Sequence, residues 1–115
     1  LNFSIKSTYP GKIQVGFLTG STTANTAVQA YIVIDPSTAQ YGYVNDGAWH
    51  QVSIPISAIV ANATPAYGQP STATLDMTKV TQPFTIADLY ASTGKTAGFP
   101  GSTTTFNIDA IYWSK

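Results

Sequence analysis

The stretch Asp46-Gly47-Ala48-Trp49-His50-Gln51-Val52-Ser53-Ile54-Pro55-Ile56-Ser57 lies near the middle of the chain and carries the strongest indication of its fold. It opens with a turn signal at residues 45–47, because glycine adopts a positive φ at no steric cost. Val52 and Ile54 then alternate with polar residues, which is the pattern of a half-buried strand. Pro55 cannot donate to a ladder, so the strand ends, bulges or lies at an edge there. We expect Trp49 to fill one end of a core.

Alternation of apolar and polar residues predicts further strands on both sides of this stretch. They cover residues 1–6, 13–17, 28–34, 41–44, 83–86 and 106–113. Ser57 is expected to cap one helical turn, residues 75–80 remain undecided, and 64–74 and 92–104 are expected to be long loops. About seven or eight short strands with turns between them predict an antiparallel β-sandwich of jelly-roll topology, with an immunoglobulin-like sandwich as the alternative.

Length and composition predict a single domain over residues 1–115 and exclude several functions. Charged residues make up 9% of the chain, and five lysines balance five aspartates. Five scattered lysines do not form the basic face that nucleic-acid binding needs. The longest apolar runs are far shorter than a membrane span requires. A strand that opens at the first residue leads us to expect a further segment upstream of Leu1.

Catalytic constellations are difficult to assemble from this sequence. His50 is the only histidine and lies in the predicted strand, where folding already explains its position. Glycoside hydrolysis needs two carboxylates that flank the scissile bond. The available carboxylates are Asp35, Asp46, Asp76, Asp88 and Asp109, and most lie at turns or strand ends, where a carboxylate accepts backbone hydrogen bonds. We therefore expect no catalytic activity from this chain.

Four segments resemble the jelly-roll carbohydrate-binding modules of polysaccharide-degrading enzymes. They are the Gly-x-Trp-x-x-Val-x-Ile-Pro-Ile-Ser stretch, the apolar strands at residues 1–7 and 15–18, and the ending Phe106-Asn107-Ile108-Asp109-Ala110-Ile111-Tyr112-Trp113. The chain is most similar to the C-terminal sandwich module of bacterial exo-acting β-glucan glucohydrolases. This resemblance implies a secreted or cell-surface module that binds a β-glucan-like polysaccharide beside a catalytic domain. It also implies a structural calcium ion at Asp109, whose other ligands would lie upstream of Leu1.

Sugars stack on aromatic rings, while their hydroxyls meet amides and charged groups. We therefore predict as binding residues the side chains of these kinds that alternate with the apolar stripe of a strand and so point away from the core. Gln29 and Tyr31 point away from the apolar stripe of residues 28–34. Lys12 and Gln14 occupy the corresponding face of the preceding strand, so all four would share one surface if the two strands share a sheet. A second layer over Tyr31 is the alternative.

Trp113 joins these binding residues if Phe106, Ile108 and Tyr112 face the core; a bulge near Asp109 would reverse that parity.

A structural or assembly domain that packs on a partner domain or subunit is the alternative function. Exposed aromatic rings on one sheet face would favour sugar binding. Exposed aliphatic side chains such as Leu18, Val33 or Val44 would favour a protein interface.

Overall fold

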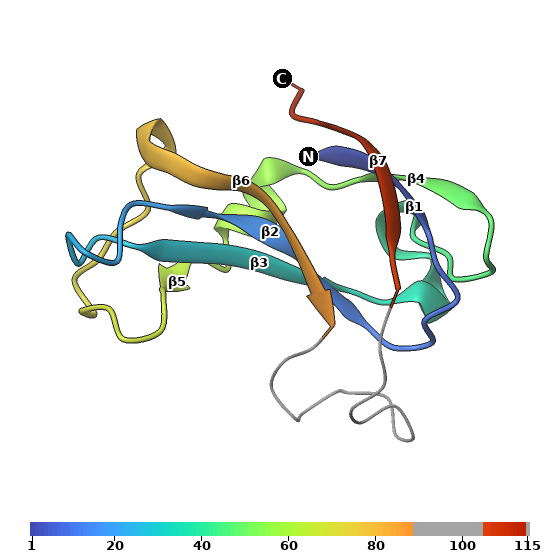
Figure 1. Ribbon diagram of the computed structural model, residues 1–115, viewed down its shortest axis with the longest axis horizontal. Helices are drawn as coiled ribbons and strands as arrows, with labels where there is room; N and C mark the ends of the chain where they lie inside the picture. Colours follow the sequence, from blue (N-terminus) through green and yellow to red (C-terminus); the bar gives the residue numbers. More distant parts are fainter. Residues whose placement is uncertain (89–104, 115) are drawn as a thin grey trace. The chain divides into compact units, whose positions relative to one another are not determined.

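The protein is described over residues 1–88 and 105–114 in a computed structural model (Figure 1). The chain forms two compact units. The first contains residues 1–14, 33–55 and the described residues from 87 onward, and the second contains 15–32 and 56–86. Two antiparallel sheets supply most of the regular structure, which confirms the predicted all-β class. The jelly-roll connection of the strands stays a prediction. In the described part of the chain, no helix has the length and apolar character needed to cross a membrane.

The sheet of the first unit has the strand order β4-β1-β7 (Figure 1). Strand β1 (Asn2–Lys6) is central, with β4 (Trp49–Ser53) on one side and β7 (Asn107–Tyr112) on the other. Both pairings are antiparallel. Beyond β1, Leu1 and Ile54 extend the ladder, since each backbone N donates to the carbonyl of the other at 2.8 and 2.9 Å.

The alternation in β1 separates a buried face from a polar one. Phe3 and Ile5 are fully buried, and Val52 of β4 is buried beside Phe3 on the same face. Asn2, Ser4 and Lys6 point to the opposite face. The predicted hydrophobic alternation of this strand is therefore confirmed.

A β-bulge interrupts the pairing of β1 with β7. Asn2 pairs with Tyr112 and Ser4 pairs with Asp109, so two steps along β1 correspond to three steps along β7. Ala110, within the extra step, has a φ of 50°, which L-residues seldom adopt. The bulge places Tyr112 on the same face as Asn2 and reverses the alternation for the rest of β7.

The short strand predicted at residues 41–44 is wrong. Two 3-10 turns occupy this part of the chain, η1 (Pro36–Thr38) and η2 (Gln40–Gly42). Tyr41 has a φ of 54° and Gly42 a φ of 91°, which are incompatible with extended backbone. A Cβ on Gly42 would lie 2.4 Å from the carbonyl oxygen of Gln51, so glycine is required for the close approach of η2 to β4.

The second sheet has the strand order β5-β3-β2-β6. Its strands are β2 (Ile13–Thr19), β3 (Val28–Ile34), β5 (Thr64–Pro65) and β6 (Val80–Asp88). Helix α1 (Ile56–Val60) confirms the predicted helical turn, but it begins before Ser57, so the prediction that Ser57 caps it is wrong. The undecided segment at residues 75–80 contains η3 (Met77–Lys79). β6 begins earlier than the predicted strand at 83–86. Ile59 of α1 is fully buried with Phe17 and Val28 in the core. The loop predicted at 92–104 lies outside the described residues.

The prediction that Trp49 fills the end of a core is wrong. Trp49 pairs with Lys6 on the polar face of the sheet, and 51% of its surface is exposed. Its strand, β4, is at the edge of the sheet, so no further strand covers the ring from that side. The inward position of β4 next to it is taken by His50, which pairs with Ile5.

We expect Phe3→Ala to lower the free energy of unfolding by about 3–5 kcal/mol, because it removes a fully buried ring from the central strand. Trp49→Ala should cost below about 1 kcal/mol, because the ring is half exposed. Urea denaturation of both variants measures the difference. An equal loss for the two would mean that Trp49 packs in the core after all.

Candidate functional site

The outward side of the β4-β1-β7 sheet forms a continuous surface, which we call the polar face. It contains Trp49, Gln51 and Ser53 of β4, Lys6, Ser4 and Asn2 of β1, and Asn107, Asp109 and Tyr112 of β7. Residues paired directly across antiparallel strands point to the same side of the sheet, which places all nine on one surface. All belong to the first unit.

Two large aromatic side chains lie at opposite corners of the polar face. Trp49 is 51% exposed and Tyr112 is 52% exposed. Trp49 pairs with Lys6 at one end of β1 and Tyr112 pairs with Asn2 at the other end, on the opposite side of the strand. Their Cα atoms are two strand spacings of about 4.8 Å apart across the sheet and four residues of about 3.4 Å apart along it, so the diagonal between them is about 17 Å. This diagonal is longer than one sugar ring.

Hydrogen bonds between side chains hold the polar groups between the two rings. Ser4 Oγ donates to Gln51 Oε1 at 3.2 Å, and Ser53 Oγ donates to Asn2 Oδ1 at 2.8 Å. Asn2 Nδ2 in turn donates to Ser114 Oγ at 3.0 Å. Because these side chains are already ordered, less conformational entropy is lost when a ligand binds to them.

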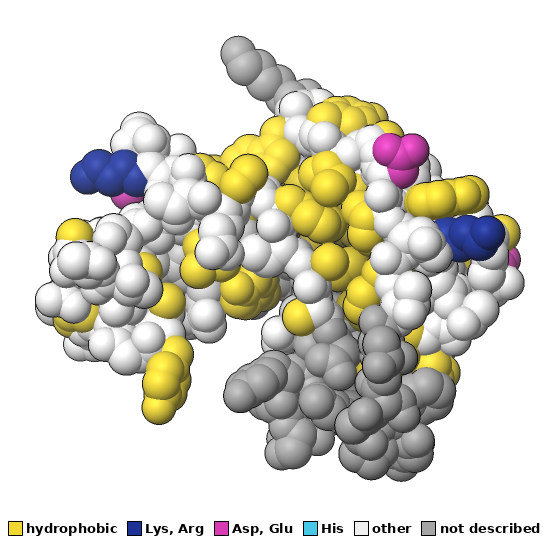
Figure 2. Space-filling view, in the orientation of Figure 1, with side chains coloured by type: hydrophobic (Ala, Val, Ile, Leu, Met, Phe, Trp, Pro, Cys, Tyr) yellow, Lys and Arg dark blue, Asp and Glu magenta, His cyan; other side chains and the backbone are white. Residues whose placement is uncertain are grey.

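The charge on the polar face is balanced. Lys6 is its cation and Asp109 its anion, and the other seven residues are uncharged. Figure 2 likewise shows charged side chains at only a few separate places on the side of the molecule that it displays. Such a surface exerts little net attraction on a polyanion, and its amides and hydroxyls can both donate and accept hydrogen bonds.

The binding residues predicted on β2 and β3 are only partly accessible. The two strands are neighbours in one sheet, as the prediction required. Gln14, Gln29 and Tyr31 are each half-buried. An ideal Cβ on Gly16 would lie 2.6 Å from Cδ1 of Tyr31, so the tyrosine ring lies over the glycine backbone. Part of the Tyr31 ring is therefore used for packing within the second unit, and its role in binding stays a prediction.

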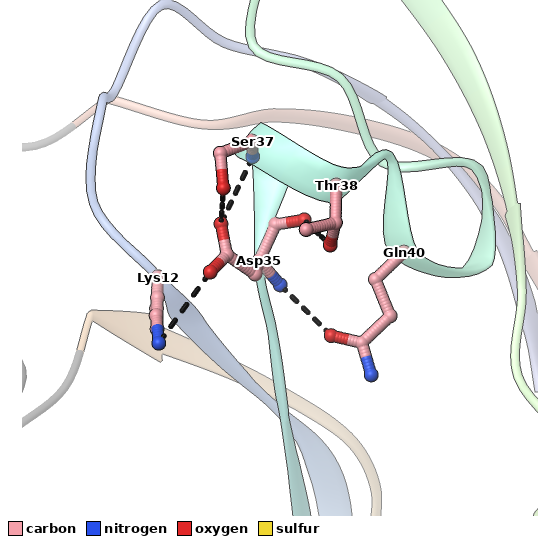
Figure 3. A network of polar contacts seen from close by, with 5 residues as sticks. All are labelled: Lys12, Asp35, Ser37, Thr38 and Gln40. Carbon is pink, nitrogen blue, oxygen red and sulfur yellow. Dashed lines mark hydrogen bonds and ion pairs between the residues drawn. The ribbon is translucent and has the colours of Figure 1, made fainter.

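Lys12, the fourth predicted residue, precedes β2 and contacts the turn after β3 (Figure 3). Its Nζ lies 3.4 Å from Asp35 Oδ2. The other oxygen of Asp35 accepts from the hydroxyl of Ser37 at 2.6 Å and from its backbone N at 2.9 Å. These bonds from Ser37, with a smaller contribution from Lys12, hold the pKa of Asp35 below its usual value of 3.8. Gln40 Oε1 accepts from Asp35 N at 3.2 Å, which closes the turn.

We expect Asp35→Asn to reduce the acid sensitivity of the protein. A carboxylate whose pKa is lowered by folding contributes stability above its unfolded pKa of 3.8, and this contribution is lost as the pH falls through the folded pKa. Asp46 and Asp76 also have lowered pKa values and titrate in both proteins, so the difference isolates Asp35. Melting temperatures measured between about pH 5 and pH 2 should fall more steeply for the wild type. Parallel curves would contradict the role of the carboxylate.

The bulge in β7 bears on the prediction for Trp113. The bulge reverses the side of the sheet to which the following residues point, so Tyr112 points to the polar face. Trp113, which follows the end of the strand, is half-buried. Tyr112 therefore takes the exposed position that the sequence analysis gave to Trp113. Binding by Trp113 itself stays a prediction.

Asp109 is exposed on the polar face, opposite Ser4, and its Oδ1 accepts from the backbone N of Ala110 at 2.7 Å. In the described part of the chain, no three His, Cys, Asp or Glu side chains gather at a possible metal site. One carboxylate does not make up the six to eight oxygen ligands that calcium takes. The calcium ion that the family resemblance implies at Asp109 stays a prediction.

Calcium binding at Asp109 is tested by thermal unfolding with and without a chelator. If a calcium ion is held there, the chelator should lower the melting temperature of the wild type and leave that of Asp109→Ala unchanged. An unaltered wild-type curve would remove the metal from this position.

Asp46 and Asp76 hold local turns together. Asp46 Oδ1 accepts from Ala48 N at 2.9 Å and lies 2.7 Å from His50 Nε2. The bond from Ala48, followed by that from His50, lowers the pKa of Asp46. Asp76 accepts from the backbone N and the hydroxyl of Thr78, at 3.0 and 2.6 Å. The expectation that these aspartates accept local backbone hydrogen bonds is confirmed.

Comparisons of this chain with protein-family models, curated proteins and solved structures found no match. Its function is therefore argued from its own geometry. The sequence analysis missed Trp49 and Tyr112 as exposed residues. For Trp49 a usable signal existed, because residues 49, 51 and 53 of one strand point to the same side and the other two are polar. Its parity matches Gln51 and Ser53, not Val52.

Proposed function

We propose that the chain is a non-catalytic carbohydrate-binding module that holds a neutral, β-glucan-like polysaccharide on its polar face. The observation that carries this proposal is the pair of half-exposed rings, Trp49 and Tyr112, at opposite corners of a sheet surface lined by amides and hydroxyls. Sugar rings stack their C–H faces on aromatic side chains, and their hydroxyls exchange hydrogen bonds with amides.

The shape and charge of the polar face favour an extended, uncharged polymer. Chains of β-1,4-linked glucose are extended, so they can lie along the diagonal between the two rings. With one cation and one anion, Lys6 and Asp109, the face has no net charge to attract an acidic polysaccharide. Stacking and a few hydrogen bonds in water give modest affinity, as expected for a module that holds a polymer near an enzyme.

The local roles of the aspartates support a non-catalytic module. Asp35, Asp46 and Asp76 each accept hydrogen bonds from their own turns, and a hydrolase of the usual kind needs a free pair of carboxylates across the bond. We place the module in a secreted or cell-surface protein whose catalytic domain is a glycoside hydrolase. This placement rests on the resemblance of the sequence.

A structural or assembly domain is the second candidate, and one observation favours it. Val33 is 39% exposed, as an aliphatic contact with a partner would require. Leu18 and Val44, the other two aliphatic residues considered, are half-buried. The exposed rings on the polar face are larger and lie among hydrogen-bonding groups, so sugar binding is the better supported function.

Trp49→Ala and Tyr112→Ala should each weaken binding to a soluble β-glucan by at least about tenfold, since the loss of one stacked ring costs about 1–2 kcal/mol and roughly 1.4 kcal/mol is tenfold. Their melting temperatures should change little, because both rings are half exposed. Affinity electrophoresis in gels that contain the polysaccharide measures the binding, and calorimetry measures the melting.

Two further tyrosine variants complete this test. Tyr67 is fully exposed in the loop after β5 and belongs to the second unit, whereas the polar face belongs to the first. Tyr67→Ala should therefore bind like the wild type. Tyr31→Ala tests the surface predicted from the sequence. Loss of binding in Tyr31→Ala, with normal binding in Trp49→Ala and Tyr112→Ala, would move the ligand to the other sheet. No binding by the wild type, together with self-association in solution, would favour the assembly function.

A further inference from the structure

A hollow of about 340 Å³ lies within the second unit. Three segments line it: the connection between β2 and β3 at residues 20–27, the loop that precedes η3, and η3 itself. In Figure 1 these segments lie at the end of the second sheet where β2 ends and β3 and β6 begin. The volume is within the range of about 300–1,000 Å³ that small-molecule sites occupy. Its polar wall residues are Asn25, Thr26, Thr72, Thr74, Asp76 and Lys79.

Hydrogen bonds between the three segments fix these walls. Gly20 N donates to Lys79 O at 2.9 Å, which joins the connection between β2 and β3 to η3. Ala27 N donates to Oε1 of Gln69 at 3.3 Å, which joins the same connection to the loop before η3. Because the walls are ordered in the free protein, less conformational entropy is lost when a ligand binds to them.

The two charged groups on the walls neutralise each other. Lys79 Nζ lies 3.4 Å from Asp76 Oδ2, while Asp76 Oδ1 accepts from the backbone N and the hydroxyl of Thr78. This ion pair leaves the hollow without net charge, so neither an anion nor a cation is strongly attracted to it. An ammonium group has three N–H donors, so Lys79 can donate to a ligand as well as to Asp76.

The uncharged groups on the walls can both donate and accept hydrogen bonds. Asn25, Thr72 and Thr74 are exposed, so one amide and two hydroxyls are available to a ligand. Among the described residues that line this hollow, Ala73 has the largest apolar side chain. A ligand with a large apolar surface would therefore gain little from burial here. The walls favour a small neutral ligand that carries many hydroxyls, which is the chemistry of a sugar.

A second hollow, of about 460 Å³, shares the wall residues Gly20, Thr26 and Lys79 with the first. Its other walls include Ala24 and Val80, so it is the less polar of the two. Sugar rings have apolar C–H faces as well as hydroxyls, and such a face can lie against aliphatic side chains. Because the two hollows share walls, a ligand of two sugar units has room in both.

We propose that these two hollows form a second binding site, which takes a short neutral sugar of one or two units. The site shares no residue with the polar face, so it does not depend on the proposed function. A few hydrogen bonds in water, without a stacked aromatic ring, give a dissociation constant of about 1 mM or weaker.

The first test is an NMR titration of the wild type and of the double variant Trp49→Ala/Tyr112→Ala with cellobiose, a neutral disaccharide. The double variant lacks both rings of the polar face, so it isolates the second site. The backbone N–H signals of Gly20 and Ala73 should shift and reach saturation in both proteins, because both residues line the hollow. Glycerol, which has hydroxyls but no ring, should shift them little. Unchanged signals, or equal shifts with glycerol, would overturn the inference.

The second test removes polar groups from the walls. Asn25 has a φ of 54°, which glycine adopts readily, so Asn25→Gly removes the amide without straining the connection. Asn25→Gly and the double variant Thr72→Ala/Thr74→Ala should each raise the dissociation constant for cellobiose about fivefold. Thr23→Ala is the matched control, because Thr23 is exposed on the same connection and outside the walls, and it should bind like the wild type. Wild-type affinity in both folded wall variants would contradict the proposal.

The outcomes separate this site from the proposed function. If cellobiose shifts the signals of Gly20 and Ala73 but the wild type binds no β-glucan, the proposed function fails and the second site stands. If the wild type binds β-glucan through Trp49 and the signals of the hollow do not respond to cellobiose, only the second site is refuted.

Discussion

The first unit depends on the double pairing of β1. This five-residue strand is hydrogen-bonded to β4 on one side and β7 on the other, and those two strands lie more than 50 residues apart in the chain. Phe3 and Ile5 anchor its inner side in the core, so the strand cannot shift by one residue without exposing both. The same constraint fixes Asn2, Ser4 and Lys6 on the outer side.

A fixed central strand turns two edge strands into one surface. Gln51 and Asp109 belong to different strands, and they share the polar face because both pair with Ser4. Hydrogen bonds from the Ser4 hydroxyl to Gln51 and from the Ser53 hydroxyl to Asn2 then order the two amide groups on this surface. Stability and the proposed binding function thus rely on the same pairing. The inner residues of β1 stabilise the core, and its outer residues contribute to the polar face.

The bulge in β7 shows how one residue changes the composition of the site. Without the extra step at Ala110, Ile111 would pair with Asn2 and Tyr112 would point to the other side. The unusual φ of Ala110 is a local strain, and it lies between the pairs Ser4–Asp109 and Asn2–Tyr112. At the opposite end of the face, the turn before β4 contains Gly47, whose φ of 80° is one that glycine adopts readily.

Local patterns in the sequence determined most of the strands. The alternation of apolar and polar residues predicted β1, β2 and β3 and their buried residues. Turn chemistry predicted the local hydrogen bonds of the aspartates at residues 35, 46 and 76. Both signals act over a few neighbouring residues, so the sequence alone carries them. Only the tertiary structure decided which strands form the edges of the sheet and where the bulge lies, since both depend on partners far away in sequence. For that reason Trp49 was expected in a core and was found at an exposed edge, and Tyr112 replaced Trp113 as the outward ring.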